Sequence, residues 1–169
     1  SVPNTLVTNA QWEWWTGLNF NTSSANYTDF YLTADNMNLS DPTNAGYLVR
    51  IGGTSDEISL YRKSGSTMTK LIDGPDGVTN SSSNNLRIKV IATSAHVWSL
   101  YTDQGGSGSN YQLTGSITDS SMTSSSFCGW SITQSTASFF QKHFLDEVYI
   151  GPILYDTLPP QLQIGRAHV

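Results

Sequence analysis

The sequence is poor in charged residues, has a single cysteine and contains no long apolar run. Asp, Glu, Lys and Arg make up 12% of its 169 residues, about half the share of an ordinary soluble protein. The lone Cys128 excludes an internal disulfide and is interpreted as a small buried apolar side chain rather than a nucleophile. No apolar segment reaches the roughly 18 residues that span a bilayer, so we expect no membrane insertion.

Basic residues are also scarce and scattered along the chain. The chain has eight Lys and Arg residues and 13 Asp and Glu residues, which gives a net charge of −5. A protein that follows a phosphate backbone needs a basic stripe or patch, and none is present. Nucleic-acid binding is therefore not expected, and an acidic surface is repelled by anionic membranes.

What the sequence has in abundance is aromatic and small polar residues. Five Trp, eight Tyr and six Phe are accompanied by many Ser, Thr, Asn and Gly. Aromatic residues favour β-strands, and their rings also provide surfaces on which sugars stack. The uncharged polar residues are typical of β-rich extracellular domains, so we expect a secreted or cell-surface protein.

Apolar and polar residues alternate in many short segments, and helical periodicity is almost absent. The segments expected to form strands are 12–20, 28–34, 47–51, 57–62, 67–72, 86–92, 96–102, 111–117, 126–133 and 143–150. Short strands separated by Gly, Asn, Asp and Ser favour an antiparallel arrangement over a parallel sheet with crossover helices. The sequence therefore predicts an all-β, antiparallel two-sheet β-sandwich, or a barrel.

The chain is interpreted as one folded unit followed by two short segments. Residues 1–154 form the expected β-sandwich domain. Residues 155–163 contain Pro159-Pro160 and are interpreted as an extended exit linker, after which a further β-domain is expected. Residues 164–169 match one reading frame of a sequencing adapter and are interpreted as a non-native tail without a function.

The order of four motifs resembles the concanavalin A-like lectin and glucanase superfamily, in particular its LamG-like jelly rolls. The motifs are Trp12-Glu-Trp-Trp15, Gly46-Tyr-Leu-Val-Arg-Ile-Gly52, Glu57-Ile-Ser-Leu-Tyr-Arg62 and Phe144-Leu-Asp-Glu-Val-Tyr-Ile-Gly151. The resemblance implies a module of a secreted, multidomain bacterial surface protein with adjacent β-domains. It also implies a first strand beside the closing strand, for which this sequence has no counterpart.

Asp146 is the candidate metal ligand. It shares the parity of Phe144, Val148 and Ile150, which points its carboxylate toward the core, where an unpaired charge is costly. Related jelly rolls place an aspartate of the closing strand on a structural Ca²⁺, and the resemblance implies the same role here, with the other ligands on the first strand. The alternative is a hydrogen-bonded aspartate at a strand start or bulge.

A candidate glycan-binding face is formed by polar and aromatic residues on the sides of strands opposite the core. Its members are Glu13, Trp15, Asp29, Tyr31, Arg50, Glu57 and Tyr61. If their strands are neighbours in one sheet, the rings can stack on sugars while the charged groups bind hydroxyls. The alternative is ordinary cross-strand pairing, in which the ions form surface pairs and the rings fill space.

A hydrolytic enzyme of this superfamily needs two carboxylates flanking a sugar bond. The Glu-x-Asp-x-x-Glu run that carries them in the glucanases does not occur in this sequence. Glu13 and Asp29 form the one carboxylate couple worth testing.

Three hypotheses follow. The first is a non-catalytic module that binds a polysaccharide or glycoconjugate, and the second is a spacer or adhesion domain without a small ligand. The third, a glycoside hydrolase or lyase, is the least favoured. A binding module should expose Trp15 and Tyr31 together, whereas in a spacer these rings should be packed under a loop.

Overall fold

The alternating segments form the strands of two antiparallel β-sheets that pack face to face. A computed structural model describes residues 1–155, so the predicted linker beyond Tyr155 and the predicted tail lie outside the described residues. The expected all-β sandwich is confirmed. Within the described residues, the one helical segment is a single 3₁₀ turn, η1 (Ala137–Phe139). No helix in this part of the chain is long and apolar enough to cross a membrane.

One sheet has six strands, four of which follow one another along the chain between residues 27 and 72. In spatial order its strands are β1 (Val2–Pro3), β10 (Phe127–Thr133), β3 (Tyr27–Ala34), β4 (Ala45–Gly52), β5 (Glu57–Ser64) and β6 (Thr67–Ile72). The hairpin from β5 to β6 turns at Gly65, whose φ of 61° lies in the left-handed region that glycine adopts without steric cost.

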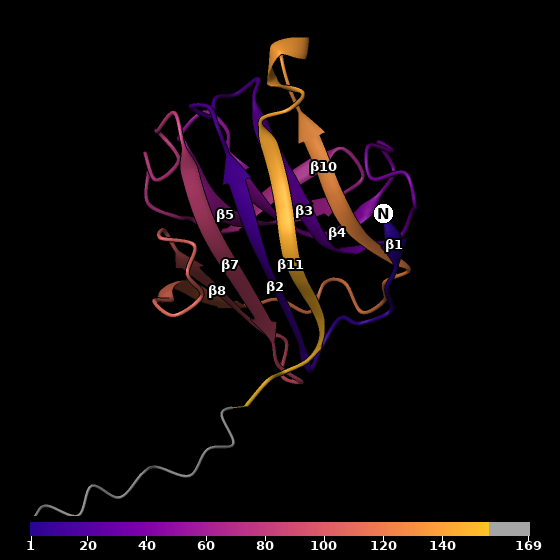
Figure 1. Ribbon diagram of the computed structural model, residues 1–169. Helices are drawn as coiled ribbons and strands as arrows, with labels where there is room; N and C mark the ends of the chain where they lie inside the picture. Colours follow the sequence, from indigo (N-terminus) through magenta and orange to yellow (C-terminus); the bar gives the residue numbers. More distant parts are fainter. Residues whose placement is uncertain (156–169) are drawn as a thin grey trace, which may run out of the picture.

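The other sheet has five strands, and β11, β2 and β7 run side by side at the front of Figure 1. In spatial order its strands are β11 (His143–Pro152), β2 (Ala10–Leu18), β7 (Asn84–Ala92), β8 (Val97–Asp103) and β9 (Gln112–Thr118). The closing strand β11 therefore pairs with β2 along nearly the whole length of β2.

The core lies between the sheets and is dominated by aromatic rings. Trp12 and Trp14 of β2 are fully buried, as the alternation of that strand predicts. Trp14 stacks on Phe30 of the opposite sheet with the ring centroids 4.1 Å apart. Trp98 is also fully buried, while Trp130 is partly buried and packs against the core.

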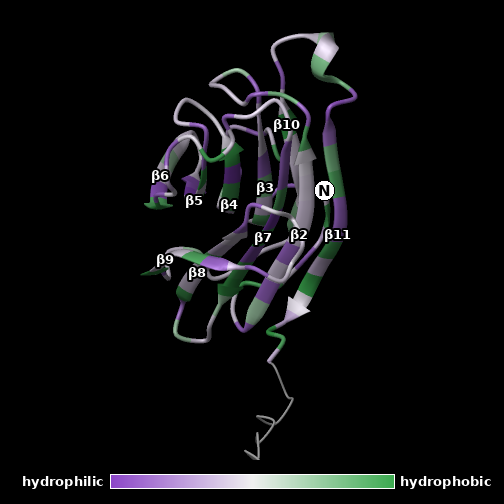
Figure 2. Cartoon of the chain, turned by 60° about the vertical axis from the view of Figure 1, so that its left-hand side comes forward, coloured by the Kyte–Doolittle hydropathy of each residue, from purple (hydrophilic) through white to green (hydrophobic). Residues whose placement is uncertain are grey.

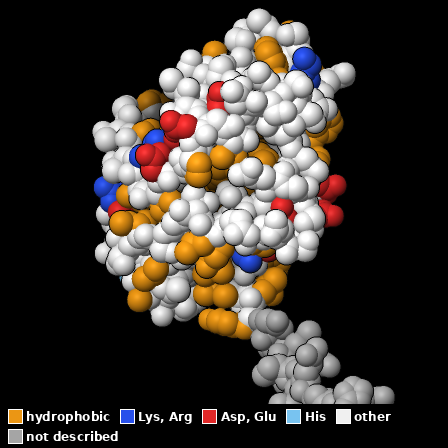
Figure 3. All heavy atoms as spheres, turned by 90° about the vertical axis from the view of Figure 1, so that its left-hand side faces the viewer, with side chains coloured by type: hydrophobic (Ala, Val, Ile, Leu, Met, Phe, Trp, Pro, Cys, Tyr) orange, Lys and Arg blue, Asp and Glu red, His pale blue; other side chains and the backbone are white. Residues whose placement is uncertain are grey.

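Few charges are visible on the surface, in keeping with the composition. Seen from the left-hand side of Figure 1, the molecule shows mostly uncharged polar groups, with hydrophobic side chains gathered in a band over the lower half (Figure 3). Some of the exposed hydrophobic side chains belong to β9, where Leu113 and Ile117 are 57% and 37% exposed.

A β-bulge interrupts the closing strand. The register of β11 against β2 shifts between Asp146 and Tyr149, and Glu147 adopts a φ of 51°. Hydrophobic and hydrophilic residues alternate along this strand in Figure 2. The extra residue reverses the parity of the strand, so that Leu145 and Ile150 both pack against the core although they are five positions apart.

His143, at the start of β11, makes stability depend on pH. Its ring packs against Phe20 with the centroids 4.6 Å apart, and both ring nitrogens are buried without a hydrogen-bond partner within residues 1–155. Burial lowers its pKa. The unfolded chain takes up a proton below about pH 6.5, while the folded chain resists it. The free energy of unfolding should therefore fall as the pH drops below about 6.5, by at most about 1.4 kcal/mol per pH unit.

Thermal melts between pH 8 and pH 5 test this expectation, with His143→Phe as the control. The variant fills the same apolar space and should lose most of the pH dependence in this window. The carboxyl groups of Asp103 and Asp119 have lowered pKa values in the fold. They therefore change the stability only below about pH 5. An unchanged slope in the variant would show that another group is responsible.

Candidate functional site

The structure divides the predicted glycan-binding face between the two sheets. Glu13 and Trp15 lie on β2 of the five-stranded sheet, whereas the other five residues lie on β3, β4 and β5 of the six-stranded sheet. The chain crosses from one sheet to the other between β2 and β3, so these consecutive strands are not neighbours. The expectation of a single shared face is therefore not met.

On the six-stranded sheet, Asp29 and Arg50 hold each other in a two-pronged ion pair. Arg50 Nε and Nη2 each donate to a carboxylate oxygen of Asp29 at 2.8 Å. Burial alone would lower the pKa of Arg50, but the hydrogen bonds and charge of Asp29 raise it above its usual value. The guanidinium also lies over the ring of Tyr27, 4.1 Å from its centroid. Most of the bonding capacity of this pair is thus used within the protein.

Tyr31 does not present an open ring. It is 5% exposed and packs with Leu48 and Leu39, the last of which belongs to the loop between β3 and β4. Burial is the largest of the effects that raise the pKa of Tyr31 to about 12. This packing under a loop is the arrangement expected for a spacer.

Glu57 and Tyr61 are likewise engaged in contacts on their own sheet. Glu57 is 3% exposed and forms an ion pair with Lys70 at 2.6 Å. The hydroxyl of Tyr61 donates to Glu57 at 3.2 Å. A hollow of about 310 Å³ remains on this side, and three of the predicted residues, Asp29, Tyr31 and Arg50, line it together with Tyr27.

On the five-stranded sheet, Glu13 is the centre of a polar network. Its carboxylate accepts hydrogen bonds from Arg87 Nε at 3.1 Å and from the hydroxyl of Tyr111 at 2.8 Å. Gln11 donates to its other oxygen at 3.0 Å. Arg87 also forms an ion pair with Glu147 of β11.

Glu13 and Asp29, the carboxylate couple considered for catalysis, are not brought together. They lie on different sheets and each pairs with an arginine of its own sheet, Arg87 for Glu13 and Arg50 for Asp29. This couple therefore cannot flank one sugar bond, and we derive no hydrolytic step from it.

Trp15 is held in a fixed orientation on the outer face of the five-stranded sheet. Its indole N–H donates to Asn85 on the neighbouring strand β7. A Cβ at Gly17 would lie 2.8 Å from Cη2 of the Trp15 ring, and a Cβ at Gly106 would lie 3.0 Å from its Nε1. The ring therefore fits close to the backbone only because both positions are glycine.

The Trp15 ring borders two hollows in the surface. One has a volume of about 330 Å³ and is lined by Arg87, Gly106, Ser107, Asp146 and Glu147 as well as Trp15. The other has a volume of about 360 Å³ and is lined by Gly17, Asn19, Ser83, Asn84, Asn85 and Phe144 as well as Trp15. We call Trp15 with these two hollows the Trp15 platform.

Asp103 fixes the loop that borders the platform. It is 2% exposed and accepts backbone hydrogen bonds from Gly105 and Gly108 at 2.9 Å and a hydroxyl hydrogen bond from Ser107 at 2.8 Å. Burial alone would raise the pKa of Asp103, but these hydrogen bonds lower it. The loop that carries Gly106 and Ser107 is thus held by a buried ionised carboxylate.

Asp146 lies on the surface, and its predicted position in the core is wrong. Alternation assigned it the parity of Val148 and Ile150, but the bulge after Asp146 reverses that parity. Asp146 is exposed, pairs in register with Trp15 and accepts the backbone N–H of Glu147 at 2.7 Å. Within residues 1–155, no group of three His, Cys, Asp or Glu could hold a metal ion. We derive no calcium site from Asp146.

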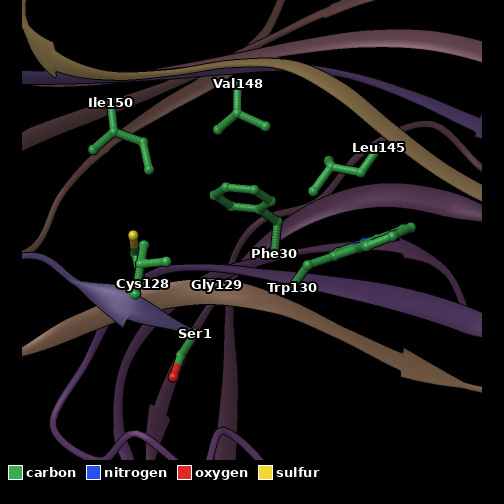
Figure 4. A pocket seen from close by; sticks show the side chains of 9 residues that line it. Ser1, Phe30, Cys128, Gly129, Trp130, Leu145, Val148 and Ile150 are labelled. Carbon is green, nitrogen blue, oxygen red and sulfur yellow. The ribbon is translucent and has the colours of Figure 1, made fainter.

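An apolar groove of about 370 Å³ opens between β10 of one sheet and β11 of the other (Figure 4). Leu145, Val148 and Ile150 point across it toward Phe30 and Trp130, and Cys128 and Gly129 line its floor. The buried thiol of Cys128 has a raised pKa because it is desolvated, as expected for an unreactive side chain. Among the described strands, β11 has β2 as its one neighbour.

Several residues of the platform were not identified from the sequence. Phe144 was placed with the core-facing residues of its strand, yet it is 43% exposed beside Gly17. Asn85 and Ser107 fall outside the segments expected to form strands. Only Gly17, an isolated glycine within a predicted strand, carried a signal of close approach.

Comparisons with known proteins give little further information. No protein-family model matches the chain, and no curated protein matches it. Among solved structures, the chain is similar to a GH43 glycoside hydrolase engineered to display both endo-xylanase and exo-arabinofuranosidase activity. The identity is 15% and the TM-score 0.47, over 89% of this chain and 31% of that chain. The chain thus spans under a third of that enzyme, and a likeness at this level carries no argument about function.

Proposed function

We propose that this chain is a non-catalytic module that binds a polysaccharide or glycoconjugate weakly, as part of an exported multidomain protein. The observation that supports it is the Trp15 platform. A partly exposed indole is held against the sheet by Asn85, Gly17 and Gly106 and is bordered by two hollows whose linings include polar groups. A fixed ring beside hydroxyl, amide and carboxylate groups can stack on a sugar and bind its hydroxyls.

The second candidate is a spacer or adhesion domain with no small ligand, and Tyr31 favours it. The ring lies under the loop between β3 and β4, and the charged residues around it pair with one another. These contacts occupy charged groups on the outer side of the six-stranded sheet. They have no bearing on Trp15, which lies on the other sheet.

Affinity electrophoresis through gels that contain single polysaccharides tests the proposal. The unaltered chain should be retarded by at least one polymer, and Trp15→Ala should bind at least about tenfold more weakly, because it loses the stacking surface. Tyr27→Ala removes a partly exposed ring from the opposite sheet and serves as the matched control. Circular dichroism and thermal melts check that both variants fold.

A second variant tests whether binding requires the Trp15 ring in its present position, and not only the presence of the ring. Gly17→Ala keeps Trp15 but places a methyl group 2.8 Å from the present position of Cη2, so the ring must turn away from the sheet. Weaker retardation of Gly17→Ala is expected. No retardation of the unaltered chain by any polymer would reject glycan binding and favour the spacer or adhesion function.

A further inference from the structure

The contact regions of the Trp15 platform and its charge favour one class of polysaccharide. Trp15 borders both hollows, so a ligand stacked on its ring has bonding groups on either side. Phe144 adds a second exposed ring: it pairs in register with Gly17, while Trp15 pairs with Asp146, so the two rings are diagonal neighbours on adjacent strands. This arrangement offers three successive contact regions rather than one closed pocket.

The hollow beside Phe144 combines aromatic side chains with polar groups that carry no charge. Its side chains include Asn19, Ser83 and Asn85, all three of which are exposed to solvent. Amide and hydroxyl groups both donate and accept hydrogen bonds, which matches the dual character of sugar hydroxyls. Among the described residues that line this hollow there is no cation to pair with a carboxylate or sulfate group on a ligand.

The hollow on the other side is acidic. Asp146 and Glu147 are exposed there, and Glu13 lies next to them, against the single guanidinium of Arg87. Glu13 and Glu147 both pair with Arg87, and Asp146 forms no ion pair within residues 1–155. Lys89, which pairs in register with Glu13, lies over the ring of Tyr111 at 4.1 Å. Even with Lys89 included, this part of the outer face carries three carboxylates and only two cations. It therefore repels an anionic ligand.

We propose that the Trp15 platform binds a neutral, linear polysaccharide and contacts at least three consecutive sugar units. The middle unit stacks on Trp15, one neighbour occupies the hollow beside Phe144, and the other occupies the hollow beside Ser107 and Asp146. Polyuronides and sulfated polymers are excluded by the carboxylates around Arg87. This inference rests on the proposed function and adds the charge and the length of the ligand.

Two series of measurements test charge and length separately. In the first, gels contain hydroxyethyl cellulose, mixed-linkage β-glucan or glucomannan as neutral, linear polymers and polygalacturonate or alginate as acidic ones. Retardation should occur with a neutral polymer and not with the acidic ones, at both low and physiological salt. Asp146→Asn removes the unpaired carboxylate and should reduce the exclusion of polygalacturonate most clearly at low salt, where repulsion is least screened.

In the second series, isothermal titration uses oligosaccharides of one to six units from the neutral polymer that retards the chain. Affinity should rise by at least about tenfold from the monosaccharide to the trisaccharide and level off beyond the units that the platform contacts. Phe144→Ala should weaken the longer oligosaccharides and leave the monosaccharide unaffected. The matched control is Leu113→Ala, which removes an exposed apolar side chain from β9 of the same sheet.

The outcomes distinguish this inference from the proposed function. Binding of polygalacturonate as tight as that of the neutral polymers would overturn the selection by charge. A monosaccharide that binds as tightly as the hexasaccharide would overturn the extended site. Either result would leave glycan binding at Trp15 in place, whereas no binding of any polymer or oligosaccharide would reject both proposals.

Discussion

Replacing Trp98 by alanine is expected to lower the free energy of unfolding by about 3–5 kcal/mol, as for other fully buried large aromatic residues. The Trp98 ring is completely buried and stacks on Trp12 of its own sheet at 5.7 Å between centroids. It also contacts Tyr47 of the six-stranded sheet, with the ring centroids 4.1 Å apart. Its loss would therefore leave a cavity that touches both sheets.

The polar end of Trp98 adds to this effect. Its indole N–H donates to the backbone carbonyl of Asp119 at 3.0 Å, and the carboxylate of Asp119 accepts the hydroxyl of Tyr47 at 2.6 Å. Trp98→Phe keeps most of the ring contacts and loses the hydrogen bond, so it should cost about 1–2 kcal/mol. Urea unfolding followed by circular dichroism measures both values. A loss below about 1 kcal/mol for Trp98→Ala would contradict the packing described here.

The second large effect is expected at the ion pair between Asp29 and Arg50. Asp29→Ala should destabilise the fold by about 2–3 kcal/mol, because it leaves a partly buried guanidinium without its two-pronged partner. The value lies below that of a fully buried pair because the Arg50 side chain retains 24% of its exposure. Stacking on Tyr27 holds the guanidinium in place, so it cannot readily turn toward water.

A double-mutant cycle measures the coupling of this pair. Asp29→Ala, Arg50→Ala and the double variant should be non-additive, with the double variant less destabilised than the sum of the two single variants. Arg50→Lys is the control for geometry, because it keeps the charge but lacks the planar fork that matches the carboxylate. Additive single effects would mean that the two side chains act independently.

The strands could be predicted from the sequence because alternation is a local property. The segments expected at 28–34 and 67–72 form β3 and β6 with nearly the expected ends. The burial of Trp12 and Trp14 also follows from alternation alone. In each case the two faces of a strand differ strongly in polarity, which fixes which side chains face the core.

The candidate face could not be predicted in the same way, since alternation assigns a residue to the outer side of a strand but not to a particular sheet. Trp15 and Tyr31 both face outward, yet the chain changes sheets between them. The burial of Tyr31 depends on a loop that folds back over its sheet, and Asp146 was misplaced by one extra residue at a bulge. These three features depend on long-range packing, which the pattern of a single strand does not encode.

Because the two outer faces differ, a binding function and a spacer function need not exclude each other. The six-stranded sheet satisfies its own charges through Asp29 with Arg50 and Glu57 with Lys70. The five-stranded sheet instead leaves Asp146 unpaired within the described residues and Phe144 exposed beside Trp15. A module of this kind can serve as a structural unit through one face and bind a polymer through the other.

The central claim, that the Trp15 platform binds sugar, is tested most directly by nuclear magnetic resonance. The chain has five tryptophans, and their indole N–H signals can be followed in ¹⁵N-labelled protein during titration with the neutral oligosaccharide that binds. The account predicts that the indole signal of Trp15 shifts, together with the amide signals of Phe144, Ser107 and Asn85, while those of Tyr27 and Arg50 remain in place. Shifts confined to Tyr27, Arg50 and their neighbours on the six-stranded sheet would contradict it.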